Sequence, residues 1–226
     1  MAASDPEAQP WGFLVYRTVY TPESNAVWDS VTSKLENYLS NSSSPSGIKR
    51  GKWAAAPRLW YMDDAALYDS LSIDQVRDDF TIQFFKNIEL SNQGAYEVFS
   101  RGAHDTICLV IDNEVIHSII DAPEDVSEAK QLFKRPTLTP KRPIPYIKAV
   151  DRHKPPKPNP PKPLHGSGGS HGREKQYPGW MKAGLLWVGD VYPQEEMEIE
   201  CPEWDPNLGD ESYPVYQGVP ASFFDY

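Results

Sequence analysis

The ten residues from Trp11 to Tyr20, WGFLVYRTVY, constrain the fold of this chain more than any other stretch. They are rich in β-branched and aromatic side chains, and Gly12 is the one residue among them that weakens a strand. Read with a period of two, both faces of such a strand are largely apolar. This pattern predicts an inner strand of a sheet that is covered on both sides. Arg17 is the exception, because it places a guanidinium group on an apolar face.

Helix and strand patterns alternate after this first strand. Thr21-Pro22-Glu23 is a helix-start signal, with a capping hydroxyl, a proline at the first helical position and an acid in the first turn. An apolar stripe with helical spacing follows it as far as Leu39. The segment Arg58–Met62 has the pattern of a short strand. Ser72 and Gln75 form a capping box, which predicts a second amphipathic helix over Ile73–Asn87.

The patterns beyond this helix are less decisive. Thr106–Ile111 is the most apolar strand of the chain. The apolar residues at 115, 116, 119 and 120 fit either a hairpin strand or a short helix, and periodicity does not choose between them. Ser127–Phe133 has a weak helical pattern, and Ala183–Val191 reads as a strand or a short helix.

Proline and glycine concentrate in residues 134–176, where ten prolines between Pro136 and Pro163 precede a Gly/Ser-rich run. Such a composition favours extended or flexible chain and does not build a core. Four residues inside it can still dock as one strand: Ile144, Tyr146, Ile147 and Val150. We therefore expect a disordered N-terminus (1–10), an α+β core (11–133), a basic Pro/Gly-rich insertion (134–176), and a last core element with an acidic tail (177–226).

The order of the elements indicates the fold class. Strand, helix, strand, helix and strand, followed by a late element after a long excursion, predict an α+β sandwich. The arrangement we expect is ferredoxin-like, with helices on one face of a mostly antiparallel sheet.

Composition narrows the cellular context. The first ten residues have neither a basic residue nor an apolar run, so we expect no secretory or transit peptide. The apolar runs are too short for a membrane-spanning helix. Cys108 and Cys201 lie far apart and indicate neither a disulfide framework nor a metal-ligand pair, and the five histidines lack metal-ligand spacing. We expect a soluble cytoplasmic protein with no membrane contact, metal or cofactor.

Charge is distributed very unevenly along the chain. The net charge is −10, yet the segment from Lys130 to Lys175 contains twelve Lys or Arg and only two acids. After Lys182 there are ten acids and no Lys or Arg. The two segments can attract each other, or each can meet a partner of its own.

Candidate site residues stand at the ends of the predicted strands. Arg17 can serve as a fixed cation for a carboxylate, a phosphate or the end of an RNA, or it can pair with a structural acid. Asp63 and Asp64 can act as acid and base or hold Mg²⁺, but they also suit a solvated turn. Asp112 ends the most apolar strand, where both loop function and ordinary turn chemistry are open interpretations.

The basic insertion offers a second kind of site. Its cations can follow a phosphate backbone, as in tRNA. Its prolines at 155–158 and 160–163 can present polyproline ligands to SH3- or WW-type domains, and a solvated linker is the plain alternative. The standard phosphate-loop and zinc-protease motifs are absent from the sequence.

Four segments carry a resemblance to known proteins: G-F-L-V-Y-R-T-V-Y at Gly12–Tyr20, the helix with Trp28, Ile107–Asp112, and G-W-M at Gly179–Met181. Together they resemble a large group of small, mostly uncharacterised fungal proteins. We hypothesise that this group is similar to the fungal arginine-containing cyclodipeptide synthases, which join two amino acids from aminoacyl-tRNAs into a diketopiperazine. The acidic signature of that family is D-D-x-x-E. This chain departs from it, because neither Asp63-Asp64 nor Asp78-Asp79 is followed by the glutamate.

The resemblance implies a division of roles. The cations of Lys130–Lys175 would hold tRNA, a carboxylate would recognise the arginine guanidinium, and a second acid or a tyrosine would deprotonate the attacking amine. Candidates for the acidic roles are Asp63, Asp64, Asp112 and Glu203, and Arg17 would bind the terminal phosphate or the oxyanion. Two other classes stay open: a non-catalytic interaction module that uses the Pro-rich arm, and a small-molecule cyclase of a secondary-metabolite pathway.

Overall fold

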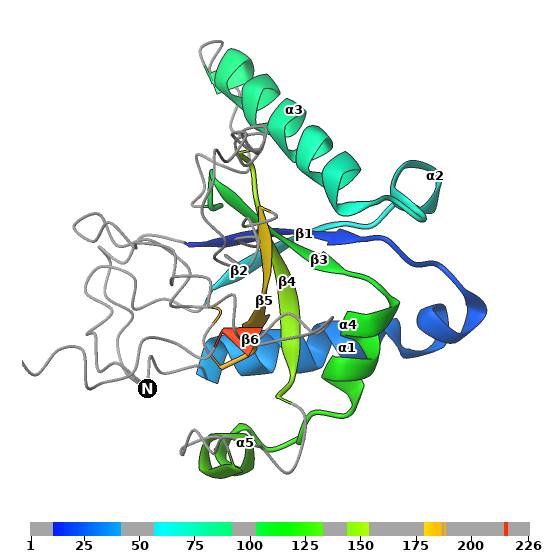
Figure 1. Cartoon of the computed structure of the whole chain (residues 1–226), viewed down its shortest axis with the longest axis vertical. Helices are drawn as coiled ribbons and strands as arrows, with labels where there is room; N and C mark the ends of the chain where they lie inside the picture. The colour runs from blue at the N-terminus through cyan, green and yellow to red at the C-terminus, as the bar shows by residue number, and fades with distance from the viewer. Residues whose placement is uncertain are drawn as a thin grey trace, which may run out of the picture.

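The computed structural model describes residues 11–41, 57–91, 103–132, 144–153, 179–186, 188 and 215–216. These ranges contain the elements labelled in Figure 1. In chain order they are β1 (Gly12–Arg17), α1 (Pro22–Asn41), β2 (Arg58–Met62), α2 (Ala65–Tyr68), α3 (Ile73–Ser91), β3 (Ile107–Ile111), α4 (Asn113–Ile120), α5 (Val126–Leu132), β4 (Tyr146–Asp151), β5 (Trp180–Gly184) and β6 (Val215–Tyr216).

The described strands form one mixed sheet of six strands in the order β2-β1-β3-β4-β5-β6. Strand β1 is parallel to both of its neighbours, β2 and β3. Strand β4 is antiparallel to β3 and β5, and β6 is parallel to β5. The carboxyl ends of β2, β1, β3 and β5 therefore lie at one edge of the sheet, together with the amino end of β4.

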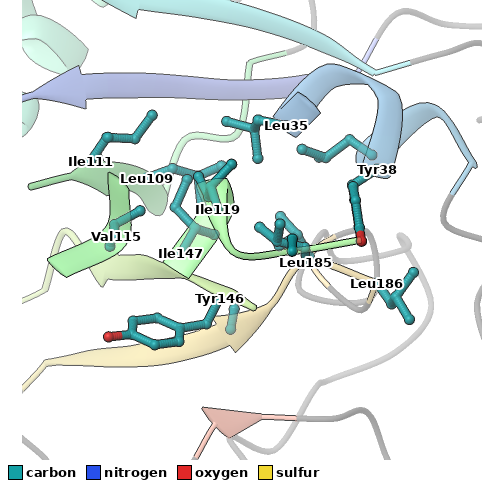
Figure 2. Packing of buried hydrophobic residues seen from close by; sticks show 14 of the residues in the cluster. Leu35, Tyr38, Leu109, Ile111, Val115, Ile119, Tyr146, Ile147, Leu185 and Leu186 are labelled. Atoms are coloured by element: carbon teal, nitrogen blue, oxygen red, sulfur yellow. The ribbon is translucent and has the colours of Figure 1, made fainter. Parts of the chain in front are cut away.

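Helices cover both faces of this sheet, as Figure 1 shows with α3 on one side and α1 and α4 on the other. Phe13 and Val15 of β1 belong to the core beneath α1 and α4, part of which is drawn in Figure 2. Leu14 and Tyr16 belong to a second core with α2 and α3, where Phe80 is buried. All six residues of β1 are buried, which confirms an inner strand covered on both sides.

Close packing begins at the start of β1. A Cβ atom added to Gly12 would lie 1.7 Å from the carbonyl oxygen of Arg58 on the neighbouring strand β2. No larger side chain fits there without a backbone shift, which explains why a strand with this composition opens on glycine.

The helix starts that the sequence predicts are confirmed by their hydrogen bonds. The Ser24 N–H donates to Thr21 Oγ1 at 3.2 Å at the beginning of α1. At α3, the Gln75 N–H donates to Ser72 Oγ at 3.3 Å, and the Ser72 N–H donates to Gln75 Oε1 at 2.9 Å. This reciprocal pair is a capping box.

The α+β class is confirmed, but the ferredoxin-like arrangement is wrong for the described elements. The sheet is mixed around a parallel trio, and the helices lie on both faces. The reason is the direction of the two crossovers. The first, through α1, leads from β1 to one neighbour, and the second, through α3, leads back past β1 to the other. Right-handed crossovers in opposite directions place their helices on opposite faces.

The boundaries of the core also need correction. Residues 144–151, which the sequence division assigned to the insertion, include β4, a strand inside the sheet. The docking of this segment as one strand is confirmed. The ambiguous residues after Asp112 form the helix α4. Of the segment Ala183–Val191, predicted as a strand or a short helix, the first two residues belong to β5, which starts earlier at Trp180 and ends at Gly184. Residues 1–10, 154–178 and most of 189–226 lie outside the described residues.

None of the helices in the described ranges combines the length and the apolar composition that crossing a membrane requires.

Candidate functional site

Three of the predicted positions meet at the carboxyl ends of the parallel strands. Asp63 and Asp64 follow β2, and Asp112 follows β3. Between them, the Thr18 N–H after β1 donates to the Ile111 carbonyl at 3.0 Å. The connections that leave the adjacent strands β1 and β2 go to opposite faces of the sheet, to α1 and to α2 and α3, and open α/β sheets bind ligands at such a switch point. The structure therefore gathers residues from distant parts of the sequence at the edge where a ligand is expected.

Arg17, at the end of β1, is buried and held by the protein itself. Its guanidinium carbon lies 4.4 Å from the ring centre of Tyr20 and 4.3 Å from that of Trp28. Its N–H groups donate to the Val19 carbonyl, Ser24 Oγ, Asn25 Oδ1 and Asp63 Oδ1. These contacts describe a positioning residue that fixes the loop after β1 and orients Asp63.

The two adjacent aspartates have different surroundings. Asp63 pairs with Arg17 at 3.4 Å and keeps 31% of its side chain exposed. Asp64 is exposed and caps α2, since its Oδ1 accepts from the Ala66 N–H at 2.9 Å. Burial raises the pKa of the neighbouring Tyr20 hydroxyl, and Asp63 raises it further. The two carboxylates therefore have separate structural roles, since Asp63 pairs with Arg17 and Asp64 caps α2.

Asp112 has two roles in the structure. Its Oδ1 accepts from the Val115 N–H at 3.0 Å and so caps α4. Its Oδ2 forms an ion pair with Lys148 Nζ, while 29% of the side chain remains exposed. The turn chemistry proposed for Asp112 is therefore present, in combination with an ion pair that the sequence did not predict.

Lys148 also belongs to a larger group, which we call the lysine cluster: Glu114, Tyr146, Lys148 and Lys182. Glu114 Oε1 lies 2.6 Å from Lys182 Nζ and also accepts from the Tyr146 hydroxyl. Glu114 Oε2 lies 3.0 Å from Lys148 Nζ. Lys148 and Lys182 are register partners on β4 and β5, so they lie directly opposite each other.

Hydrogen bonding controls the protonation of the lysine cluster. Burial alone would raise the pKa of Glu114, but hydrogen bonds from Lys182, Tyr146 and Lys148 outweigh it and lower the pKa to about 2. Burial alone would lower the pKa of Lys148, but its bonds to Asp112 and Glu114 outweigh burial and raise it. Burial raises the pKa of Tyr146, and the bond to Glu114 raises it further. At neutral pH Glu114 is therefore a carboxylate and Lys148 an ammonium group.

The sequence patterns did not predict the lysine cluster, although they selected Asp112, which lies beside it. Its members come from three elements that no local motif connects. One signal was present, because Tyr146 and Lys148 stand at alternate positions of an otherwise apolar strand. Glu203, the remaining sequence candidate, lies outside the described residues.

Two buried groups elsewhere are structural. His104 Nδ1 accepts from the Thr106 and Ile107 N–H groups, and burial lowers its pKa to about 4. Cys108 is fully buried in β3, and burial raises its thiol pKa. Among the described residues, no group of three or more His, Cys, Asp or Glu side chains is arranged to hold a metal ion.

No protein-family model, curated protein or solved structure matches this chain. The assignment of function therefore rests on the geometry of the carboxyl-end edge.

Proposed function

We propose that the protein is an enzyme that binds a cationic, amino-acid-derived substrate at the carboxyl-end edge of β2, β1 and β3. One observation carries this proposal: the carboxylates of Asp63, Asp64 and Asp112 gather at this edge beside the switch point, and all three are partly or fully exposed. Such carboxylates provide hydrogen-bond acceptors for a guanidinium or an ammonium group.

Arg17, which is buried at the end of β1, supports this arrangement. Because its guanidinium lies between two aromatic rings and donates to Asp63, it holds that carboxylate in one orientation. A preoriented carboxylate binds a planar guanidinium with less loss of side-chain entropy. This role replaces the direct contact with a phosphate or an oxyanion that the sequence suggested for Arg17.

The reaction that we propose to test is arginine-containing cyclodipeptide synthesis from aminoacyl-tRNAs. In each of its two condensations an α-amine attacks an ester carbonyl, a base takes the amine proton, and the tRNA 3′-hydroxyl leaves. An edge carboxylate would bind the arginine side chain, and a second one would accept the proton. This assignment depends on the resemblance of the sequence, combined with the acidic character of the edge.

The tRNA would be held by cations of the segment Lys130–Lys175. Three of these cations lie in the described residues and have protein partners. Lys148 pairs with Asp112, the Lys130 Nζ lies 2.6 Å from the Asn41 carbonyl, and the Arg152 guanidinium lies 3.9 Å from the ring centre of Phe84. The contacts to tRNA are therefore assigned to the other cations of the segment, which lie outside the described residues, as do the polyproline motifs at 155–163.

The experiment is product analysis by mass spectrometry of a host that expresses the full chain. We expect a new arginine-containing cyclic dipeptide, absent from the host alone. Asp64→Asn and Asp112→Asn should reduce its yield by at least about tenfold, the effect expected from loss of a charged contact or a general base. Asp29→Asn, which changes an exposed acid of α1, is the matched control and should keep the yield.

An unchanged metabolite profile from folded protein would contradict the proposed reaction. It would favour the interaction module, which predicts binding to polyproline-recognition domains, or the small-molecule cyclase, which predicts ligand binding that ribonuclease does not affect.

A further inference from the structure

We propose that Tyr146, Lys148 and Lys182 form a binding site for an oxyanion, the carboxylate or phosphate group of a ligand, and that Glu114 fills this site when no ligand is bound. This proposal does not depend on the reaction proposed above. It follows from the way in which the lysine cluster is built.

Two buried lysines of the cluster lie opposite each other. Lys148 and Lys182 are direct cross-strand partners, and only 10% and 11% of their side chains are exposed. Two like charges placed opposite each other on a sheet destabilise it, and burial increases the cost. A sheet tolerates such a pair when a negative group lies between the two ammonium groups, which is the position of Glu114.

Three donors converge on the Glu114 carboxylate. The Glu114 carboxylate is bonded to two ammonium groups and a phenol hydroxyl, at 2.6 Å from Lys182 and 3.0 Å from Lys148. Charge-assisted donors that converge on two oxygens form the arrangement that binds a carboxylate or a phosphate. A ligand oxyanion in place of Glu114 would find the same donors.

The exposure of Glu114 differs from that of the two lysines. The cations are almost completely buried, whereas 51% of the Glu114 side chain is exposed. Glu114 belongs to the first turn of α4, so it can leave by rotating its side chain into solvent without unfolding the helix. Asp112 would stay, since its second oxygen caps α4, and it would leave Lys148 partly neutralised.

Aromatic rings also support the two ammonium groups, independently of Glu114. Lys182 Nζ lies 4.5 Å from the ring centre of Tyr146, and Lys148 Nζ lies 5.4 Å from that of Trp180. Figure 2 shows the Tyr146 ring at the border of the aliphatic cluster, with its hydroxyl directed away from the labelled aliphatic side chains. Cation–π contacts keep the donors in place when the carboxylate leaves.

The test is isothermal titration calorimetry of inorganic phosphate, and separately of acetate, into the purified full chain. Glu114→Gln keeps the size of the side chain and removes its charge. It should raise the affinity for at least one of the two anions by about tenfold or more, the effect of one additional charge-assisted hydrogen bond to the anion. A preference for phosphate would assign the site to a phosphate group, and a preference for acetate would assign it to a carboxylate.

Two matched variants control for non-specific effects. Glu124→Gln removes a different lysine-bound carboxylate, the highly exposed partner of Lys34, and should leave the affinity unchanged. Adding Lys182→Met to Glu114→Gln should abolish the increase in affinity. If Glu114→Gln does not fold, Glu114→Asp provides the same comparison, because the shorter side chain cannot reach both lysines. Equal affinities in wild type and the Glu114 variant, or an increase that survives Lys182→Met, would overturn the proposal.

Discussion

Arg17 Nη1 lies 3.4 Å from Asp63 Oδ1, which joins the last residue of β1 to the first residue after β2 at the edge where the candidate site lies. The pair is asymmetric, because 6% of the Arg17 side chain is exposed against 31% for Asp63. The arginine is thus a buried structural residue, and the aspartate is the partner that solvent and ligands can reach.

Substitution of Arg17 should therefore affect stability first. Arg17→Lys keeps the charge but loses the planar donors and the stacking between Tyr20 and Trp28. We expect it to lower the free energy of unfolding by about 2–3 kcal/mol, because several bonds to a buried charged group are lost. Asp63→Asn should cost less than about 1 kcal/mol, since it alters a partly exposed pair. Urea denaturation measures both, and equal effects would contradict the structural role of Arg17.

Lys34 provides a second test of a buried cation. Its ammonium group, on α1, donates to the carbonyls of Ile120 and Ala122 at 2.9 Å and so closes the C-terminal end of α4. Lys34→Met should cost about 1–3 kcal/mol, because buried carbonyls lose their donor. Glu124→Gln should cost less than about 0.5 kcal/mol, since 87% of the Glu124 side chain is exposed. Thermal denaturation measures the stability of both variants. Equal stabilities would contradict the structural role of Lys34.

The contribution of the lysine cluster to the free energy of unfolding should depend on pH in the acidic range. The folded-state pKa of Glu114 is about 2, below its ordinary value of 4.5, so its ionised form stabilises the folded protein above about pH 4.5. That contribution is lost as the pH falls from about 4.5 to about 2. We expect wild type to be more stable than Glu114→Gln at pH 6 and the difference to shrink towards pH 2. A difference that is constant with pH, measured by urea denaturation, would contradict this linkage.

The two faces of the sheet should unfold together. Leu35 is buried in the core beneath α1, and Phe80 is buried in the core beneath α3. Leu35→Ala should cost about 2–5 kcal/mol and Phe80→Ala about 3–5 kcal/mol, the usual range for cavities in a packed core. Both variants should shift one cooperative transition, seen by fluorescence and circular dichroism alike. Separate transitions would show that the two layers are independent units.

The sequence predicted those features that depend on neighbouring residues. The unbroken apolar run Phe13–Tyr16 indicated coverage on both faces, and Ser72 and Gln75 indicated the start of α3. The ferredoxin-like prediction failed because local sequence patterns do not determine the direction of a crossover. The direction of the crossover decides which face of the sheet each helix covers. The prediction also conflicted with the double coverage that the first strand itself indicated.

The same distinction, between what neighbouring residues indicate and what the fold brings together, applies to the candidate site. Asp63, Asp64 and Asp112 could be chosen because each follows a strand, and the parallel trio brings those strand ends together. The contacts among Glu114, Lys148 and Lys182 depend on the pairing of β3, β4 and β5 across long stretches of chain. No sequence motif indicates which residue pairs with a lysine in a strand. The cluster can therefore be recognised only in the folded structure.

The measurement that tests the carboxyl-end site most directly is a nuclear magnetic resonance titration of the purified full chain with L-arginine methyl ester. L-citrulline methyl ester, which has nearly the same shape and lacks the guanidinium charge, is the matched control ligand. The account predicts amide shift changes concentrated at residues 17–20, 63–66 and 112–115, weak or absent with citrulline and reduced in Asp64→Asn. Shift changes elsewhere in the protein, or the same response to both esters, would contradict it.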